Sequence, residues 1–208
     1  MNPPTHPFVS RLPVGQRIPR PDDGILLWSV FPFEGEFQVR VLDPPELPEP
    51  PRHGQDGPDS CRRCQEPEHN VIWGDEHWVL THLGEPSGLP LLVVLHPRDH
   101  HDFSDLPVER SAELGPLMQR IEKAMLSLGG IARVHFNRWG DGSAHLHIWF
   151  IARPEGMLQL RGACLAIWDD VLPKAPQPKI THTENHFFRQ DVDAWMVMVA
   201  VKYGTKVM

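Results

Sequence analysis

The residues best suited to chemistry form a short motif in which two histidines alternate with apolar residues. The motif reads His145-Leu-His147-Ile-Trp149-Phe. In an extended strand, successive side chains point to opposite faces, so both imidazoles and the Trp149 indole would share one face while the apolar residues face the core. Two histidines so spaced can share one site. A solvated strand face with chance histidines is the alternative interpretation of this pattern alone.

A second candidate site is the Cys-x-x-Cys pair formed by Cys61 and Cys64. This spacing suits two thiolate ligands of tetrahedral zinc, and two further ligands must come from elsewhere. The chain has three cysteines, too few for a disulfide framework. Cys164 stands alone in an apolar stretch and is interpreted as a core residue. We expect these two cysteines to bind zinc. The alternative is a redox pair, or a pair that binds nothing.

Strands and one long helix are expected to position these residues. Leucine, isoleucine and methionine at three- and four-residue steps predict a helix over 106–128, which Gly129 and Gly130 end. Short β-branched, aromatic or continuously apolar runs predict strands at 71–73, 77–81, 89–95, 132–137 and 145–152. A helix between groups of strands predicts an α+β fold.

The composition changes along the chain and suggests four parts. Residues 1–23 are a Pro-rich arm, because they are too poor in periodic apolar positions to bury a face. Residues 24–57 hold a strand pair, at 25–31 and 36–42, and a polar linker. Residues 58–155 form the domain that carries both motifs. Residues 156–208 form a C-terminal extension, in which we expect a helix over 192–203.

The motifs, taken in order, resemble the histidine triad (HIT) superfamily, whose signature is His-x-His-x-His with apolar x. The resemblance extends upstream, through the Cys61–Cys64 pair, an apolar strand that ends His96-Pro-Arg-Asp-His100, the helix, and Asn137 and Ser143 before the motif. It covers residues 61–153, about half of the chain. It implies a HIT-like antiparallel sheet with one long helix, to which this chain would add its N-terminal strand pair and C-terminal extension, and a nucleotide or nucleotide-conjugate substrate.

The resemblance also implies roles for single residues. His147 would be the catalytic nucleophile, which attacks an α-phosphate and forms a nucleotidyl-histidine that water or a second acceptor resolves. Asn137 and Ser143 match positions that bind the phosphate or the leaving group, although turn formation also explains both. Trp149 stands where most members have the third His and the uridylyltransferase branch has Gln. It can donate one N–H or stack on a base, but it cannot shuttle a proton.

In zinc-bearing members of the superfamily, the other two ligands are a His after the apolar strand and the first His of the motif. These positions correspond to His100, with His101 as an alternative, and to His145. Four protein ligands would close the coordination shell, so the zinc would be structural. Ligation by His145 would leave His147 free for chemistry.

Charge and composition exclude other classes of protein. The chain has 20 Lys and Arg against 27 Asp and Glu, a formal charge of -7, which is not the footprint of a duplex nucleic-acid scaffold. No apolar run reaches the ~20 residues that span a membrane, and no secretory signal can be recognised, so we expect a cytoplasmic protein. We expect a HIT-like nucleotide hydrolase or nucleotidyltransferase. The alternative is a zinc-stabilised nucleotide-binding module without turnover, and homodimerisation is left open.

Overall fold

The computed structural model describes residues 12–19, 24, 28–66, 68–182 and 198–201. Its contacts divide the chain into two compact units, Met1–Pro51 and Arg52–Met208. The second unit carries both motifs. No helix within the described residues is long and apolar enough to cross a membrane.

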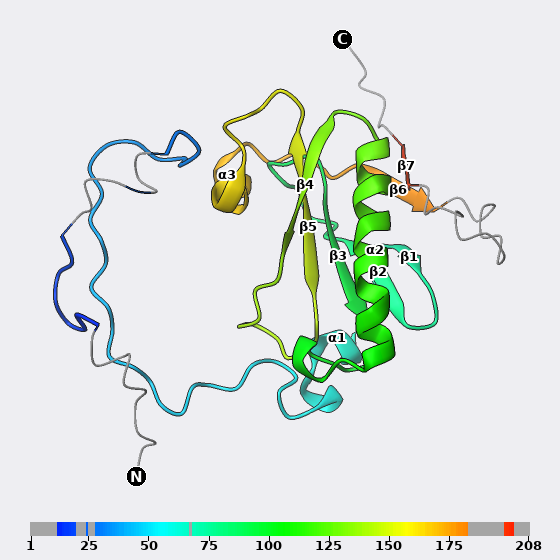
Figure 1. Ribbon diagram of the computed structural model, residues 1–208, viewed down its shortest axis with the longest axis horizontal. Helices are drawn as coiled ribbons and strands as arrows, with labels where there is room; N and C mark the ends of the chain where they lie inside the picture. The colour runs from blue at the N-terminus through cyan, green and yellow to red at the C-terminus, as the bar shows by residue number, and fades with distance from the viewer. Residues whose placement is uncertain (1–11, 20–23, 25–27, 67, 183–197, 202–208) are drawn as a thin grey trace. The chain divides into compact units, whose positions relative to one another are not determined.

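The second unit is built on a five-stranded sheet in which all neighbouring strands run antiparallel. The strand order is β1-β2-β3-β5-β4 (Figure 1), with β1 Val71–Gly74, β2 Trp78–His82, β3 Leu92–Pro97, β4 Ile131–Asn137 and β5 Ile148–Pro154. The central strand β3 is buried along its whole length, which explains its unbroken apolar run. The expected α+β fold with an antiparallel sheet is confirmed.

One face of this sheet is covered by the long helix α2, Val108–Ser127, which lies along the strands in Figure 1. The helix buries one face, and its side chains there pack against strand residues such as Leu80, Val93 and Phe150. Its buried residues are Leu114, Leu117, Ile121, Ala124 and Met125. Burial at three- and four-residue steps is the pattern that predicted the helix.

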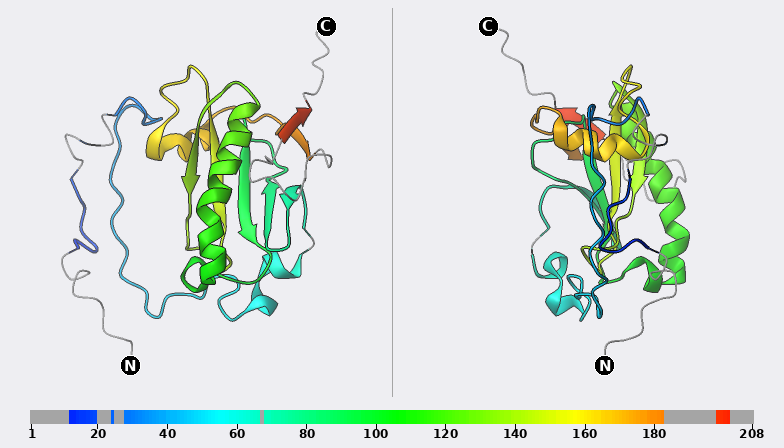
Figure 2. Two further views of the ribbon diagram at one scale, coloured as in Figure 1. Left: turned by 45° about the vertical axis from the view of Figure 1, so that its right-hand side comes forward. Right: turned by 90° about the vertical axis from the view of Figure 1, so that its left-hand side faces the viewer.

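The opposite face of the sheet holds a smaller apolar cluster that includes α3, Leu165–Val171. Leu165 packs there with Leu92 and Ile151, and Figure 2 shows the helix from two sides. Part of the C-terminal extension is therefore fixed to the sheet. The remaining short elements are α1 Arg62–Gln65, the 3-10 turns Pro58–Ser60, Phe103–Asp105 and Gly162–Cys164, and a ladder of β6 Lys179–His182 with β7 Met198–Val201.

Two expectations about the chain's ends are corrected. Among the described residues of 25–31 and 36–42 there is no strand, only an isolated bridge from Leu42 to Val14. A two-stranded ribbon without a third strand or a helix to pack on is marginally stable, so β-propensity alone was misleading here. The helix expected over 192–203 is also wrong in its described part, since Met198–Val201 is a strand. The rest of that segment, and most of 1–23, lie outside the described residues.

Two boundaries near the motif also differ from expectation. The second unit starts at Arg52, and the backbone of His53 pairs with Gly142 and Ala144, so the end of the expected linker 24–57 contacts the motif loop. Strand β5 begins at Ile148, so His145 and His147 precede the strand. The reason is that Leu146 N donates to His101 O, a loop carbonyl. Burial nevertheless alternates as expected, with Leu146, Ile148 and Phe150 in the core.

Candidate functional site

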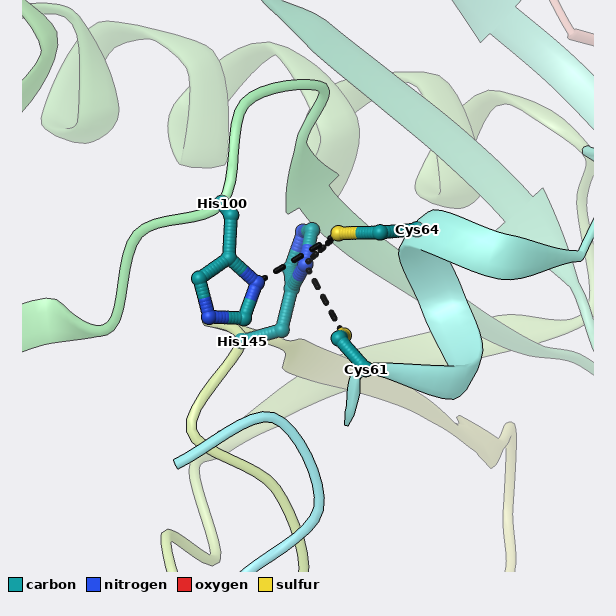
Figure 3. Close-up of side chains that lie close together, drawn as sticks. All are labelled: Cys61, Cys64, His100 and His145. Atoms are coloured by element: carbon teal, nitrogen blue, oxygen red, sulfur yellow. Dashed lines mark hydrogen bonds between the residues drawn. The ribbon is translucent and has the colours of Figure 1, made fainter. Parts of the chain in front are cut away.

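Four side chains meet at one end of the sheet, each with one ligand atom within 4.8 Å of the other three (Figure 3). They are Cys61, Cys64, His100 and His145. His145 Nδ1 lies 3.6 Å from Cys61 Sγ and 3.4 Å from Cys64 Sγ, and His100 Nδ1 lies 3.3 Å from Cys64 Sγ. Ligand atoms about 2.0–2.3 Å from a tetrahedral zinc are themselves about 3.3–3.8 Å apart. The donor set and its spacing fit a closed, structural zinc site.

Three separate elements supply these ligands. Cys61 is the N-cap of α1 and Cys64 lies within that helix, where Cys64 N donates to Cys61 O at 3.1 Å. His100 follows β3, and His145 precedes β5. A metal ion here would fasten α1 to the ends of two neighbouring strands. His101, the alternative to His100, lies outside the cluster, with its Nδ1 4.0 Å from Asp105.

Both ligand histidines are held in the tautomer that a metal requires. His100 Nε2 lies 2.9 Å from Gly54 O, and His145 Nε2 lies 2.9 Å from Pro97 O. A carbonyl oxygen only accepts, so each Nε2 carries the proton and each Nδ1 offers a lone pair to the metal. Burial lowers the pKa of His145, which favours its neutral form. Burial and the neighbouring Cys61 raise the pKa of Cys64 to about 11, so two thiolates here require a cation.

Gly54 is part of this site, although in the sequence it is only one glycine in a polar segment. Its φ is +78°, and a Cβ there would lie 2.8 Å from His100 Cε1 and 2.9 Å from Cys61 Cβ. Residues that carry a side chain rarely adopt this backbone conformation. A Cβ at residue 54 would also not fit beside His100 and Cys61. The segment therefore approaches the cluster closely enough for its carbonyl to orient His100 only because residue 54 is glycine.

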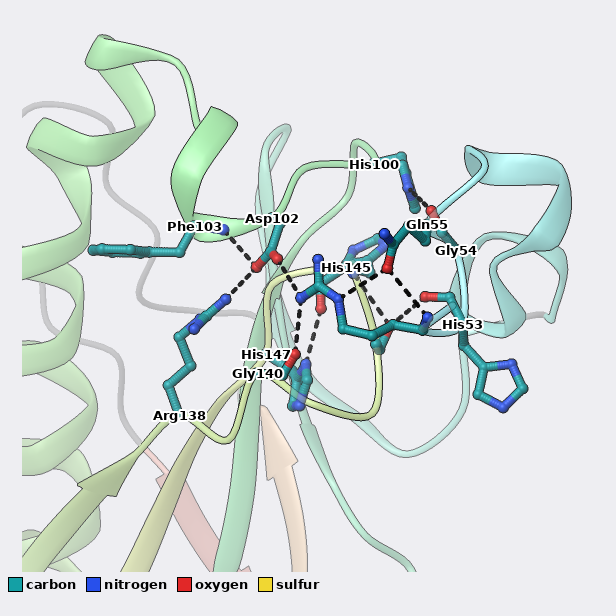
Figure 4. Close-up of polar contacts among 12 residues, drawn as sticks. His53, Gly54, Gln55, His100, Asp102, Phe103, Arg138, Gly140, His145 and His147 are labelled. Atoms are coloured by element: carbon teal, nitrogen blue, oxygen red, sulfur yellow. Dashed lines mark hydrogen bonds and ion pairs between the residues drawn. The ribbon is translucent and has the colours of Figure 1, made fainter. Parts of the chain in front are cut away.

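A buried carboxylate connects the segments around the site. Asp102 is 8% exposed and accepts from Arg138 Nη2 at 2.5 Å, from Arg52 Nη1 at 2.7 Å and from Phe103 N at 2.7 Å (Figure 4). Burial alone would raise the pKa of Asp102, but the hydrogen bonds from both arginines and the backbone lower it to about 2. Arg52 also donates to Gly140 O at 2.8 Å. This network ties the start of the second unit to the loop before the motif.

Beside the cluster lies a cavity of about 490 Å³, large enough for a nucleotide. Its lining includes His53, Arg63, His96, Ser143, His147 and Trp149. His147 Nδ1 lies 2.8 Å from His145 O. Because the carbonyl accepts, Nδ1 carries the proton of the neutral ring, and Nε2 keeps a lone pair. The arrangement provides an oriented, unprotonated imidazole nitrogen in the wall of a cavity.

Of the other residues named from the sequence, two line the cavity with His147 and one does not. Ser143 lines the cavity, and its Oγ donates to His53 O at 3.3 Å and accepts from His145 N at 3.2 Å. Trp149 lines the cavity and meets Trp139 edge to face, with ring centroids 5.9 Å apart. Asn137 ends β4 opposite Trp149 and is not among the residues that line the cavity.

His96 is a cavity residue to which the sequence assigned no role. Strands β3 and β5 pair Val94 with Trp149 and Leu95 with Ile148, and continuing this register sets His96 opposite His147. His96 is 5% exposed, and its Nε2 is buried without a hydrogen-bond partner. Burial, reinforced by the charge of Arg63, lowers the pKa of His96 to about 2, so the ring is neutral.

No family model and no curated protein matches this chain. Among solved structures, a Zn-bound histidine triad family protein from Mycobacterium smegmatis is similar at 21% identity and a TM-score of 0.39, over 47% of this chain and 74% of that one. A HIT family hydrolase from Legionella pneumophila Philadelphia 1 is similar at 19% identity and a TM-score of 0.33, over 43% of this chain and 85% of that one. This chain's resemblance to histidine triad proteins rests on its motif residues.

Proposed function

We propose that this protein is a HIT-like nucleotide hydrolase or nucleotidyltransferase that acts at an α-phosphate through His147. The observation that carries the proposal is the hydrogen bond between His147 Nδ1 and His145 O, at 2.8 Å. It fixes the proton on Nδ1 and leaves the Nε2 lone pair available for attack. The adjoining cavity of about 490 Å³ is of the size that binds nucleotides.

The proposed reaction has two displacements. In the first, His147 Nε2 forms a bond to the α-phosphorus, and the bond between phosphorus and the leaving oxygen breaks with its electron pair on that oxygen. In the second, water or another acceptor attacks the phosphorus, and the electron pair of the N–P bond returns to Nε2. Trp149 lines the same cavity and carries an N–H that can stabilise the phosphoryl oxygens, and Ser143 could do so by exchanging its 3.3 Å hydrogen bond to His53 O for one to the substrate.

The metal cluster has a supporting part in this proposal. When bound, zinc closes a four-ligand shell and supplies rigidity rather than an activated water. The residues of the cluster do the positioning, because His145 joins it through Nδ1 while its own carbonyl orients His147.

The alternative function is a nucleotide-binding module without turnover. Trp149 favours it, because an indole cannot protonate a leaving group. The two functions differ in one product, the covalent adduct on His147.

The test is covalent trapping on the zinc-loaded full chain. Adenylated and guanylated substrates labelled at the α-phosphate are incubated with the protein, which is then denatured in base. We expect a base-stable, acid-labile label on the native protein and none on His147→Ala. His53→Ala is the control, since this exposed histidine lines the same cavity without an assigned role. Substrate binding without label or product from the native protein would reject the enzyme in favour of the binding module.

A further inference from the structure

The motif loop, residues 138–147, contains no helix or strand, yet a short segment of chain pairs with its backbone. That segment is residues 52–54. His53 N donates to Gly142 O at 3.3 Å, and His53 O accepts from Ala144 N at 2.8 Å. The two hydrogen bonds form an isolated parallel bridge. The motif loop therefore takes its backbone partners from a segment that precedes the first cysteine of the metal cluster.

Arg52 anchors the start of this segment with one atom of its guanidinium. Nη1 donates to Asp102 Oδ2 at 2.7 Å and to Gly140 O at 2.8 Å (Figure 4). Asp102 belongs to the loop after β3, whereas Gly140 belongs to the motif loop. A charged donor makes stronger hydrogen bonds than a neutral one. Arg52 therefore joins the two loops at the point where the segment begins.

The other end of the segment is fixed at the metal cluster. Gly54 O accepts from His100 Nε2 at 2.9 Å, and Gly54 N donates to Ser60 O at 3.1 Å. Between the two ends, His53 O also accepts from Ser143 Oγ at 3.3 Å. Three residues thus contact the loop after β3, the motif loop and the turn before α1.

Ser143 is the cavity residue whose position depends most on these contacts. It lines the cavity together with His147. Its loop contains Gly140 and Gly142, and glycine has more conformational freedom to lose on folding than any other residue. The loop therefore needs outside contacts to hold a side chain in one place. A displacement of about 1 Å in an active site can lower a rate about 10²-fold.

We propose that Arg52 is a positioning residue, which holds Ser143 in place through the segment 52–54 while His147 attacks. The inference rests on the proposed function and adds to it a residue outside the family resemblance. Arg52 is not among the residues that line the cavity, so it acts on the loop rather than on the substrate. The contacts of His53 with the loop are made by its backbone, so His53→Ala retains them.

The first measurement requires no substrate. Hydrogen exchange of the Ala144 amide, which donates to His53 O, is followed by NMR in the zinc-loaded full chain. In Arg52→Met we expect this amide to exchange about 10-fold faster or more, because the segment opens more often without its anchor. The Ala152 amide donates to Leu91 O at 2.9 Å in the sheet, and its exchange rate should change less than about twofold.

Arg98→Met is the matched control. Arg98 also makes one hydrogen bond to a carboxylate and one to a carbonyl, with Glu68 and Asp75 O, each at 2.6 Å. Its side chain is 35% exposed, against 31% for Arg52. Neither of its two acceptors belongs to the motif loop or to the segment 52–54. We therefore expect the Ala144 amide of Arg98→Met to exchange as in the native protein.

The second measurement is steady-state turnover of the substrate that labels the native protein most in the trapping experiment. We expect Arg52→Met to lower kcat about 10- to 100-fold and to change KM less than about threefold, because a displaced loop weakens transition-state stabilisation more than binding. Arg52→Lys, which keeps a charged donor, should recover part of this loss. In a Ser143→Ala background the loss should shrink to about threefold or less, because both changes remove one effect.

The outcomes separate the positioning role from the reaction. All variants are compared at equal zinc content and well below their melting temperatures. Faster exchange at Ala144 in Arg52→Met, without any label on native His147, would keep Arg52 as the anchor of the loop and reject the proposed function. A label on His147 with equal kcat in Arg52→Met and Arg98→Met would overturn the positioning role and keep the reaction.

Three further results would overturn the positioning role. The first is an unchanged exchange rate at Ala144 in Arg52→Met. The second is a rise in KM without a fall in kcat, which would give Arg52 a part in substrate binding instead. The third is a loss of kcat that is just as large in the Ser143→Ala background, since Arg52 would then not act through Ser143.

Discussion

The metal cluster and the adjoining cavity use the same kinds of side chain, but they differ in whether the nitrogen atoms of these side chains have hydrogen-bond partners. In the cluster, each imidazole has a carbonyl partner on Nε2, and each Nδ1 lies within 4.8 Å of both thiols. Of the residues that line the cavity, His96 and Arg63 each have a buried nitrogen, Nε2 and Nη2, without a hydrogen-bond partner. A site whose donors are oriented by the protein is complete once its ion is bound, whereas a buried donor without a partner costs free energy. The hydrogen bonding of the polar atoms therefore distinguishes the metal cluster from the cavity.

The largest expected effect is loss of the metal cluster. Cys64→Ser, or chelation of the native protein, should lower the free energy of unfolding by about 5 kcal/mol or more, because structural zinc contributes about 10–16 kcal/mol in zinc-finger peptides. The melting temperature should fall by about 10 °C or more. Zinc content and calorimetric melting measure both. Cys164→Ala, at a buried cysteine outside the cluster, should keep one zinc per chain, and an unchanged melting temperature in Cys64→Ser would remove the stabilising role.

Gly54→Ala tests whether close backbone approach completes the cluster. The added Cβ would lie 2.8 Å from His100 Cε1 at a φ of +78°. We expect a loss of about 2–4 kcal/mol and weaker zinc affinity, because both strain and overpacking act. Gly57→Ala has a φ of +113° but no neighbouring atom within 4 Å, so it should lose stability through strain alone. Equal zinc affinity in the two variants would contradict the close-approach explanation.

Acid titration tests the Asp102 network that joins the cluster to the motif loop. The pKa of Asp102 is lowered from 3.8 to about 2, so its contribution to stability is fully present above the unfolded-state pKa and is lost as pH falls toward 2. We expect the native protein to lose about 1–2 kcal/mol between roughly pH 5 and pH 2 that Asp102→Asn does not lose. Urea unfolding at several pH values measures it, and parallel curves for both proteins would refute it.

The smallest expected effect is a gain in stability rather than a loss. His96→Leu removes a buried nitrogen without a partner, so we expect a gain of about 1 kcal/mol in unfolding free energy. His82→Leu is the matched change on β2, where His82 Nδ1 accepts from Gly84 N at 3.0 Å, and it should bring no gain. Urea denaturation measures both. A loss of stability in His96→Leu equal to that in His82→Leu would mean that His96 is satisfied by the protein itself.

Patterns of spacing predicted the elements that local sequence determines. The helix around Leu117 and Ile121 and the alternation of Leu146 and Ile148 follow from periodicity, and both are found. The ligands His100 and His145 were named from the family resemblance, and they do lie beside the cysteines. The strand pair near Leu42 failed because β-propensity depends on a neighbouring strand that the sequence does not reveal.

Other features of the site depend on contacts between distant segments and leave no local pattern. Asp102 is joined to residues 50 and 36 positions away, Arg52 and Arg138. The need for Gly54 arises from the approach of His100, and the unpartnered nitrogen of His96 from its position opposite His147. In the sequence each is an ordinary loop or strand residue, because its partners come close only in the folded structure.

His145 belongs to both regions through different atoms. Its side chain is one corner of the metal cluster, while its carbonyl oxygen, 2.8 Å from His147 Nδ1, fixes which nitrogen of that ring is the base. The backbone and the side chain of one residue cannot shift independently over such short distances. Under the proposed function, loss of the metal would therefore also disturb the orientation of the His147 ring, and activity would depend on the supply of the ion.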